Sequence, residues 1–213
     1  QVGDGNSSMV FQTGTNGAVG DPDNVYDLPD ADSLVGVTQF GDNNTSTIVQ
    51  SGDNAVADVF SLGDDNDASI TQQGNFSNAA VKQVGNSNTA TIVRQTADGT
   101  GSVPDPRFPV LPDDFADAFV SQTGDDNTAT VTQDAVPVFA SITQLGDGNV
   151  SSIDQSGTAA GASATPLQTS DDNTSRVTQS AGAIANVAQG GGVNEIGGRE
   201  WNGSDFPPPP ALG

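Results

Sequence analysis

The sequence predicts an all-β fold: a β-solenoid of about seven 22-residue strand-turn-strand coils that form two facing parallel sheets. Three observations predict this fold. Gln recurs at intervals of 11 residues, at positions 122, 133, 144 and 155. Each interval holds one turn signal and one strand signal. Alternate turns differ in composition, so the structural repeat is two intervals, or 22 residues. Each strand would then pair with the equivalent strand one coil away.

Residues 122–133, QTGDDNTATVTQ, are the clearest copy of the interval. The segment GDDN is typical of a turn, because Gly tolerates positive φ and Asp and Asn side chains bond the local backbone. The segment TATVT alternates with period two and is mostly β-branched, which predicts a short strand. Each interval therefore contributes one turn and one strand, and the chain about fourteen strands.

Regular turns of this kind occur once per 22-residue unit: GDGN at 3–6, GDNN at 41–44, GDDN at 63–66, GNSN at 85–88, GDDN at 124–127, GDGN at 146–149 and SDDN at 170–173. The intervening turns are irregular. Excursions at about 13–33, 96–116 and 156–163 all replace irregular turns, so we expect them on one edge of the solenoid. The solenoid is predicted to span 1–189, followed by a Gly/Pro-rich C-terminal tail at 190–213.

Alternation within each strand assigns its two faces. We place the Ala, Val and Ile face inside, because only that face can form a dry seam, and the Thr-rich face outside. Burial of one Val or Ile contributes roughly 1.5–3 kcal/mol. The predicted inward apolar residues are Val10, Val37, Ile48, Val59, Ile70, Val81, Ile92, Val120, Val131, Ile142, Ile153, Val177 and Val187.

Asn and Gln recur at the ends of the strands on this same inward face. Stacked amides can bond along the stack as ladders, which would add to a thin apolar core; the alternative is that these side chains face water. The 11-residue regularity favours ladders. Their predicted members are Gln12, Gln39, Asn44, Gln50, Asn66, Gln72, Gln83, Asn88, Gln122, Asn127, Gln133, Gln144, Asn149, Gln155, Gln168, Asn173 and Gln179.

The composition narrows the class of protein. Apolar residues make up only 33% of the 213 residues and the formal net charge is −22, which would suggest disorder without the repeats. The acidic balance argues against nucleic acid and against anionic membrane surfaces as partners. The chain has no Cys and no apolar stretch long enough for membrane insertion. Gln1 is already in register with the repeat, which fits a secreted protein whose targeting segment has been removed, although a fragment would begin in the same way.

The pattern Q-x-G-x-x-N-x-A-x-[IV]-x-Q, doubled in a 22-residue unit, resembles the curlin repeat of bacterial curli. Residues 118–155 match it most closely, and the resemblance covers most of 1–12 and 34–189. It implies a secreted subunit that polymerises into an extracellular functional amyloid of the biofilm matrix, with roles in adhesion. It also implies a nucleating partner and an outer-membrane secretion channel. The Asp-rich turns and the two long insertions depart from the family's familiar pattern.

The two ends of the solenoid are the predicted functional sites. An open coil end exposes unpaired backbone donors and acceptors, and monomeric solenoids cap such ends. Nothing in 1–12 reads as a cap, so we expect copies to stack head-to-tail into a cross-β filament, a homopolymer. Predicted polymer contacts are Ser7, Met9 and Phe11 at one end and Trp201 and Phe206 in the tail, which could act as a strap or be a disordered end.

The acidic turns are a second candidate site. Asp42, Asp64, Asp125, Asp147 and Asp171 share one turn position and would lie about 5 Å apart on the stack, where Ca²⁺ could relieve their repulsion. Solvated carboxylates are the simpler interpretation, and no cofactor is required. The competing function is a monomeric acidic solenoid that binds calcium, ice or glycans through its turns or its Thr rows. With no His, no Cys and one Lys, the sequence does not predict an enzyme.

Overall fold

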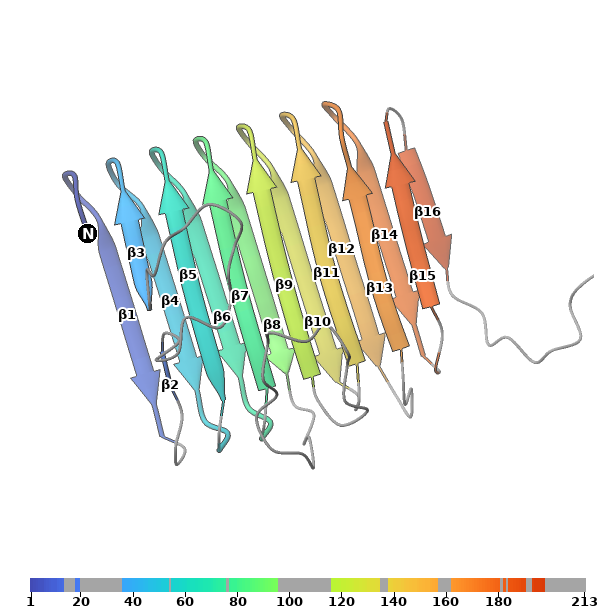
Figure 1. Cartoon of the computed structure of the whole chain (residues 1–213), viewed down its shortest axis with the longest axis horizontal. Helices are drawn as coiled ribbons and strands as arrows, with labels where there is room; N and C mark the ends of the chain where they lie inside the picture. The colour runs from blue at the N-terminus through green and yellow to red at the C-terminus, as the bar shows by residue number, and fades with distance from the viewer. Residues whose placement is uncertain are drawn as a thin grey trace, which may run out of the picture.

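The computed structural model shows a flat β-solenoid (Figure 1). It describes residues 1–13, 18–19, 36–53, 55–75, 77–95, 116–134, 138–156, 162–180, 182, 184–190 and 193–197. Over these ranges the chain forms two parallel sheets with no helix, as the sequence predicts. No helix of the described part is long and apolar enough to cross a bilayer.

Sheet B runs in the order β1-β4-β6-β8-β10-β12-β14-β16. Its strands are β1 (Ser7–Gln12), β4 (Thr45–Gln50), β6 (Asp67–Gln72), β8 (Thr89–Gln95), β10 (Thr128–Asp134), β12 (Val150–Ser156), β14 (Thr174–Gln179) and β16 (Val193–Gly197). Sheet A runs from β15 to β5, and both β2 and β3 pair with β5. Its strands are β2 (Ala18–Val19), β3 (Val37–Phe40), β5 (Val56–Leu62), β7 (Ser77–Val84), β9 (Ala116–Thr123), β11 (Val138–Leu145), β13 (Ala162–Gln168) and β15 (Ile184–Gln189).

From β3 onward the chain alternates between the sheets, so β3 and β4 make the first full coil and β15 and β16 the seventh. The strand pairs of the described residues are parallel and follow the repeat: Val131 aligns with Ile92 on one side and Ile153 on the other. Gln133 aligns with Gln155 in the same way. Strand β8 departs from this register at its end, where one extra residue places Gln95 opposite Gln72 and Gln133. Two strands, β2 and β16, add to the fourteen that the sequence predicts, and β16 extends sheet B beyond residue 189.

The regular turns explain the Gly-Asp-x-Asn signature. At their first position, Gly63 has φ +119°, and a Cβ there would lie 2.1 Å from the carbonyl oxygen of Gly85 in the next coil. At their third position Asp65 and Asp126 adopt left-handed backbone with φ 58°. Asn and Asp tolerate that region better than other non-Gly residues. The first position therefore selects Gly, with Ser170 in the last regular turn as the exception, and the third admits Gly, Asn, Asp and, at Ser87, Ser.

The core is the single seam between the sheets. The inward side chains of the inner coils are almost all closed to solvent, with Ile48, Ile70, Ile92 and Val131 each 0% exposed. Ala rows flank them, for example Ala68, Ala90 and Ala129 in sheet B. Because each coil adds only a few apolar side chains, at most four in the core cluster, each coil depends on its neighbours above and below for burial.

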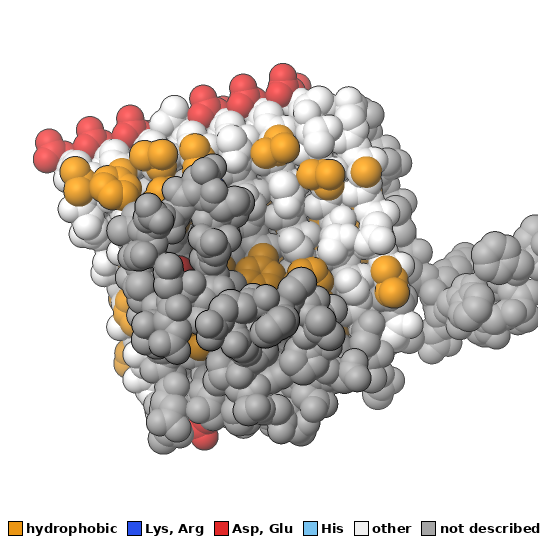
Figure 2. All heavy atoms as spheres, in the orientation of Figure 1, with side chains coloured by type: hydrophobic (Ala, Val, Ile, Leu, Met, Phe, Trp, Pro, Cys, Tyr) orange, Lys and Arg blue, Asp and Glu red, His pale blue; other side chains and the backbone are white. Residues whose placement is uncertain are grey.

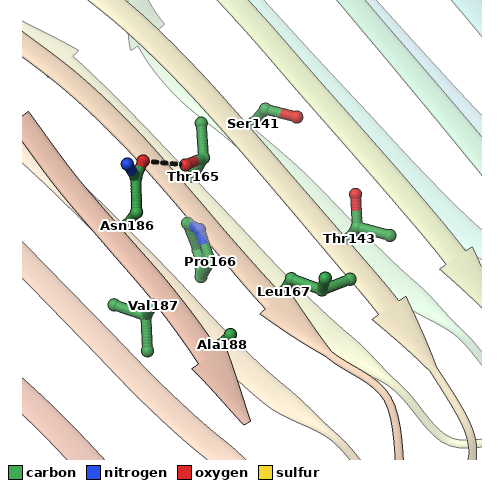
Figure 3. A pocket seen from close by; sticks show the side chains of 8 residues that line it. All are labelled: Ser141, Thr143, Thr165, Pro166, Leu167, Asn186, Val187 and Ala188. Atoms are coloured by element: carbon green, nitrogen blue, oxygen red, sulfur yellow. Dashed lines mark hydrogen bonds between the residues drawn. The ribbon is translucent and has the colours of Figure 1, made fainter.

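The regular stack is interrupted at β13, where Pro166 occupies an inward position. The β11–β13 ladder pairs Ala140 with Ala164 and Thr143 with Leu167 but omits the two residues between them. Pro has no N–H to donate, so one ladder bond is lost. A hollow of about 350 Å³ lies at this point of sheet A, lined by side chains of β11, β13 and β15, and the Thr165 hydroxyl donates to Asn186 Oδ1 there (Figure 3).

Candidate assembly interface

Gln side chains join the coils along the stack and also join the two sheets. In sheet A, Gln122 Nε2 donates to Gln144 Oε1 at 2.9 Å, and Gln144 Nε2 donates to Gln168 Oε1 at 2.9 Å. The same Gln122 nitrogen donates to the Thr89 carbonyl of sheet B at 3.0 Å. In sheet B, Gln155 Nε2 donates to Gln179 Oε1 and to the Phe139 carbonyl of sheet A. Each buried amide is thus bonded to two different strands.

Asn at the fourth position of each regular turn forms a third ladder. Asn66 Nδ2 donates to Asn44 Oδ1 at 3.0 Å and to the Gly85 carbonyl at 2.8 Å. The backbone N–H of Asn66 also donates to Asn44 Oδ1. The pattern repeats at Asn88 and Asn127. Because all these groups are buried, losing one amide would leave donors and acceptors in several coils without partners.

The Asp residues of the regular turns form a ladder with the backbone. The N–H of Asp42 donates to Asp64 Oδ1 at 2.8 Å, and the N–H of Asp125 donates to Asp147 Oδ1 at 2.8 Å. Asn86 takes part through the same oxygen position, which explains why Asn can replace Asp there. Sequence reasoning missed this role, although the Asp/Asn restriction at the second turn position was its signal. The carboxylates form an exposed acidic row along one edge (Figure 2).

The five proposed calcium ligands, Asp42, Asp64, Asp125, Asp147 and Asp171, lie in this row, and each has an oxygen bonded to a backbone N–H of the neighbouring coil. Over the described ranges, no three His, Cys, Asp or Glu residues are grouped so that they could hold a metal ion. What the row can do chemically is accept hydrogen bonds and carry negative charge.

The predicted ladder residues are buried from Gln39 to Gln179, whereas Gln12 is exposed. The predicted inward apolar residues are likewise buried from Ile48 to Val187, with Val37 partly buried and Val10 45% exposed. Both departures lie at the N-terminal end of the stack. Of the predicted polymer contacts, Ser7, Met9 and Phe11 lie on β1, and Trp201 and Phe206 lie outside the described residues.

Strand β1 is the open end of sheet B (Figure 1). Among the described residues it pairs with β4 alone, on one side, and all six of its residues are exposed. Ser7 and Thr13 donate their N–H groups to carbonyls of the next coil. Since successive residues of a strand direct their backbone groups to opposite sides, the N–H and C=O groups of Ser8, Val10 and Gln12 point away from the stack. Met9 (55% exposed) and Phe11 (56%) add apolar surface beside this free edge.

The last coils carry buried polar atoms without a hydrogen-bond partner among the described residues: Asn149 Nδ2, Ser151 Oγ, Asn173 Oδ1 and Ser175 Oγ. In earlier turns the Asn amide donates to the first-position carbonyl of the next coil. At the turn 170–173, the Ser170 carbonyl instead accepts from Asn173 at 2.6 Å. Ser151 and Ser175 align with Ala129, so they place hydroxyls in the apolar row. Among the described residues, the hydrogen-bonding capacity of buried polar side chains is therefore less completely used in these coils than in the central ones.

One outward-facing carboxyl group has a strongly shifted pKa. Asp117 of β9 aligns with Asn78 on one side and Phe139 on the other. Burial raises the pKa of Asp117 from 3.8 to about 6, although a 2.9 Å hydrogen bond from Asn78 Nδ2 acts in the opposite direction. Asn78 is itself only 3% exposed and Asp58, on the same face of β5, 8%. The alternation of the sequence places this face of sheet A on the outside. It does not predict that residues on this face are buried.

The fold places the chain in the class of parallel β-solenoids with a 22-residue repeat. Hydrogen-bonded Asn and Gln ladders line its interior, and β1 is an edge strand of sheet B among the described residues. Comparison with family models identifies the curlin associated repeat at residues 31–59, 63–93 and 117–134. The chain therefore contains curlin associated repeats in these three segments. Searches of curated proteins and of solved structures found no match.

Proposed function

We propose that this chain is the structural subunit of an extracellular curli-like amyloid fibre and polymerises by pairing strands at its coil ends. The observation that carries the proposal is β1, which is paired on one side and exposed along its whole length. A free strand edge of this kind is a template for another chain. The curlin repeats support the same conclusion, because curli subunits are the proteins in which such repeats are known.

The partner of β1 is a second copy of the chain. Inner coils bind their neighbouring coils through the same groups: backbone N–H and C=O groups, an Asn amide and two Gln amides. Gln12 Nε2 donates to Gln50 Oε1, and no bond to Gln12 Oε1 occurs among the described residues. The end therefore offers a further coil the same acceptor that Gln50 offers Gln12. Stacking by this rule is a translation along the solenoid axis and produces an open filament.

In this role the chain is a structural protein of the biofilm matrix and of cell adhesion, secreted to the cell surface, and not an enzyme. A nucleator and an outer-membrane secretion channel are its proposed partners, by analogy with other curli-type systems. The acidic row keeps the surface of such a fibre strongly negative, because six of the seven regular turns carry an Asp at the second position.

The test is electron microscopy of the chain after dilution from denaturant, with Ser8→Pro and Ser8→Thr as matched variants. Ser8→Pro removes a backbone N–H of β1 that points away from β4, and it leaves the hydrogen bonds between β1 and β4 intact. Ser8→Thr keeps this N–H. We expect unbranched filaments from the wild type and Ser8→Thr, with or without chelator, and at least tenfold slower elongation for Ser8→Pro. Wild-type particles that stay monomeric at every concentration would refute the proposal.

A further inference from the structure

An apolar ridge runs along the outer face of sheet A, beside the regular turns. It is formed by residues that immediately precede these turns, and the first six of the seven align in the sheet A ladder. The backbone joins neighbours in the row: the N–H of Gly85 donates to the Leu62 carbonyl at 2.9 Å. In chain order the row is Val2, Phe40, Leu62, Val84, Thr123, Leu145 and Thr169. The five apolar members make up the ridge, and Thr123 interrupts it.

The ridge is open to solvent and lies on one side of the turns only. Leu62 is 44% exposed and Leu145 42%, and hydrophobic side chains are visible directly below the acidic row in Figure 2. The residues that immediately follow the same turns lie on the outer face of sheet B. They are Ser7, Thr45, Asp67, Thr89, Thr128, Val150 and Thr174, so only one of the seven is apolar. The exposed apolar row beside the turns therefore belongs to sheet A.

Negative charge borders the ridge along its whole length. The acidic row begins two residues after the ridge in each coil, as at Leu62 and Asp64, and the seven regular turns together hold nine Asp residues and no Lys or Arg. On the other side of the ridge the face is nearly uncharged. Lys82 is the one basic residue in the described strands of sheet A, and it lies two residues before Val84, away from the turns. The surface is therefore apolar along one line and anionic along a parallel line.

We propose that the ridge and the acidic row together bind a cationic amphipathic helix of another polypeptide, which lies along the solenoid axis. Ridge residues repeat at about 4.8 Å, the spacing of neighbouring strands. An α-helix brings one face back every turn, or about 5.4 Å, so a helix in this direction meets the ridge with one apolar side chain per turn. From Val2 to Leu145 the ridge extends about 24 Å, the length of a helix of about 16 residues.

Charge decides which partner covers the ridge. A second copy of this chain carries the same acidic row beside its own ridge and a formal net charge of −22, so two ridges in contact would bring like charges together. A helix with Lys or Arg along one flank of its apolar face places those cations over the Asp row and away from Lys82. The whole surface lies on one copy, so this binding does not depend on whether filaments form.

The chain itself supplies substitutions that leave the stack intact. Asp64→Asn removes a charge and keeps the ladder bond, because Asn86 Oδ1 already accepts from the Asp64 N–H at 2.9 Å. Leu62→Thr removes ridge surface and introduces the residue that Thr123 provides in the same row. The matched control is Val150→Thr: Val150 is 43% exposed beside the same edge but on sheet B, and Thr128 and Thr174 align with it.

The test measures binding of a fluorescent helical peptide of Leu and Lys, about 16 residues long with its Leu on one face, to the full chain by anisotropy. A peptide of the same composition in scrambled order lacks the apolar face. We expect the helical peptide to bind at least tenfold more tightly than the scrambled one.

Leu62→Thr combined with Leu145→Thr, and Asp64→Asn combined with Asp125→Asn, should each weaken binding of the helical peptide at least fivefold. Val150→Thr should leave the affinity unchanged, and Thr123→Leu, which closes the gap in the ridge, should raise it at least twofold. Urea midpoints verify that each variant is folded. Equal affinity for the helical and scrambled peptides would show binding by charge alone and overturn the proposal. Unchanged affinity in the Leu62 and Leu145 variant, or an equal loss in Val150→Thr, would also overturn it.

Discussion

Asp117→Asn should stabilise the folded chain at neutral pH. Asp117 ionises with a pKa of about 6 in the folded state against 3.8 in the unfolded state. The folded state therefore prefers the protonated acid. Below pH 3.8 the carboxyl is protonated in both states and its ionisation costs nothing. Between pH 4 and pH 6 the unfolded chain ionises first, so stability falls as pH rises, and the loss is complete above about pH 6.

The size of the effect follows from the two pKa values. At about 1.36 kcal/mol per pH unit, the difference corresponds to a cost on the order of 3 kcal/mol at pH 7. Asn at this position is uncharged at every pH and retains an oxygen that can accept from Asn78 Nδ2. We therefore expect Asp117→Asn to gain on the order of 2–3 kcal/mol at pH 7 and close to nothing at pH 3.

The assay is urea denaturation of the monomeric chain at pH 3, 5 and 7.5, followed by circular dichroism. Asp67→Asn is the matched control, because Asp67 is an exposed carboxylate on the outer face of sheet B. The midpoint of Asp117→Asn should exceed that of wild type at pH 7.5 and converge with it at pH 3, whereas the control should not show this pH-dependent gain. Equal stability of wild type and Asp117→Asn at all three pH values would refute the burial argument.

Three further predictions concern the stack, each measured as a shift in the urea midpoint of the monomer. Ser151→Ala should stabilise the chain by about 1 kcal/mol, because the buried Ser151 hydroxyl has no hydrogen-bond partner among the described residues. Ser46→Ala should destabilise it, because Ser46 Oγ accepts a hydrogen bond from Gln39 Nε2 at 2.9 Å. A lower midpoint for Ser151→Ala than for Ser46→Ala would contradict this argument. Gly63→Ala should cost about 3 kcal/mol or more, since its Cβ would meet a carbonyl at 2.1 Å, while Asp126→Gly should change stability by less than about 1 kcal/mol; similar effects of both would be inconsistent with the turn geometry. Pro166→Ile should stabilise by about 1 kcal/mol by restoring a ladder N–H, and a lower midpoint would show that the proline conformation is preferred there.

The sequence predicted the architecture because its periodicities are strict. The 11-residue spacing around Gln122 and Gln133 and the alternation between them require parallel, in-register stacking, and the structure has two parallel sheets of this kind. Strand β16 was missed because Val193–Gly197 lacks the terminal Gln. The backbone-bonding role of Asp64 and its equivalents was missed because periodicity describes faces and not hydrogen-bond partners.

Two properties of the candidate site could be seen only in the three-dimensional structure. Alternation assigns Asp117 to the outer face but contains no information on what desolvates it. The sequence also places Val10 in the same inward row as Ile48, and only the topology shows that no sheet A strand of the described residues faces it. A coil at the end of the stack lacks a neighbouring coil on one side, whereas an inner coil has one on both sides. The repeat pattern of the sequence is the same for both, so it cannot predict this difference in burial.

Cryo-electron microscopy of filaments grown from the wild-type chain tests the central claim most directly. Sheet B contributes eight strands per copy. If copies stack end to end with unbroken pairing, each copy advances the filament by about 38 Å, at about 4.8 Å per strand. We predict that rise, with the strands perpendicular to the filament axis and β16 of one copy beside β1 of the next. Filaments in which copies associate through the outer faces of the sheets, with β1 still exposed, would contradict the account.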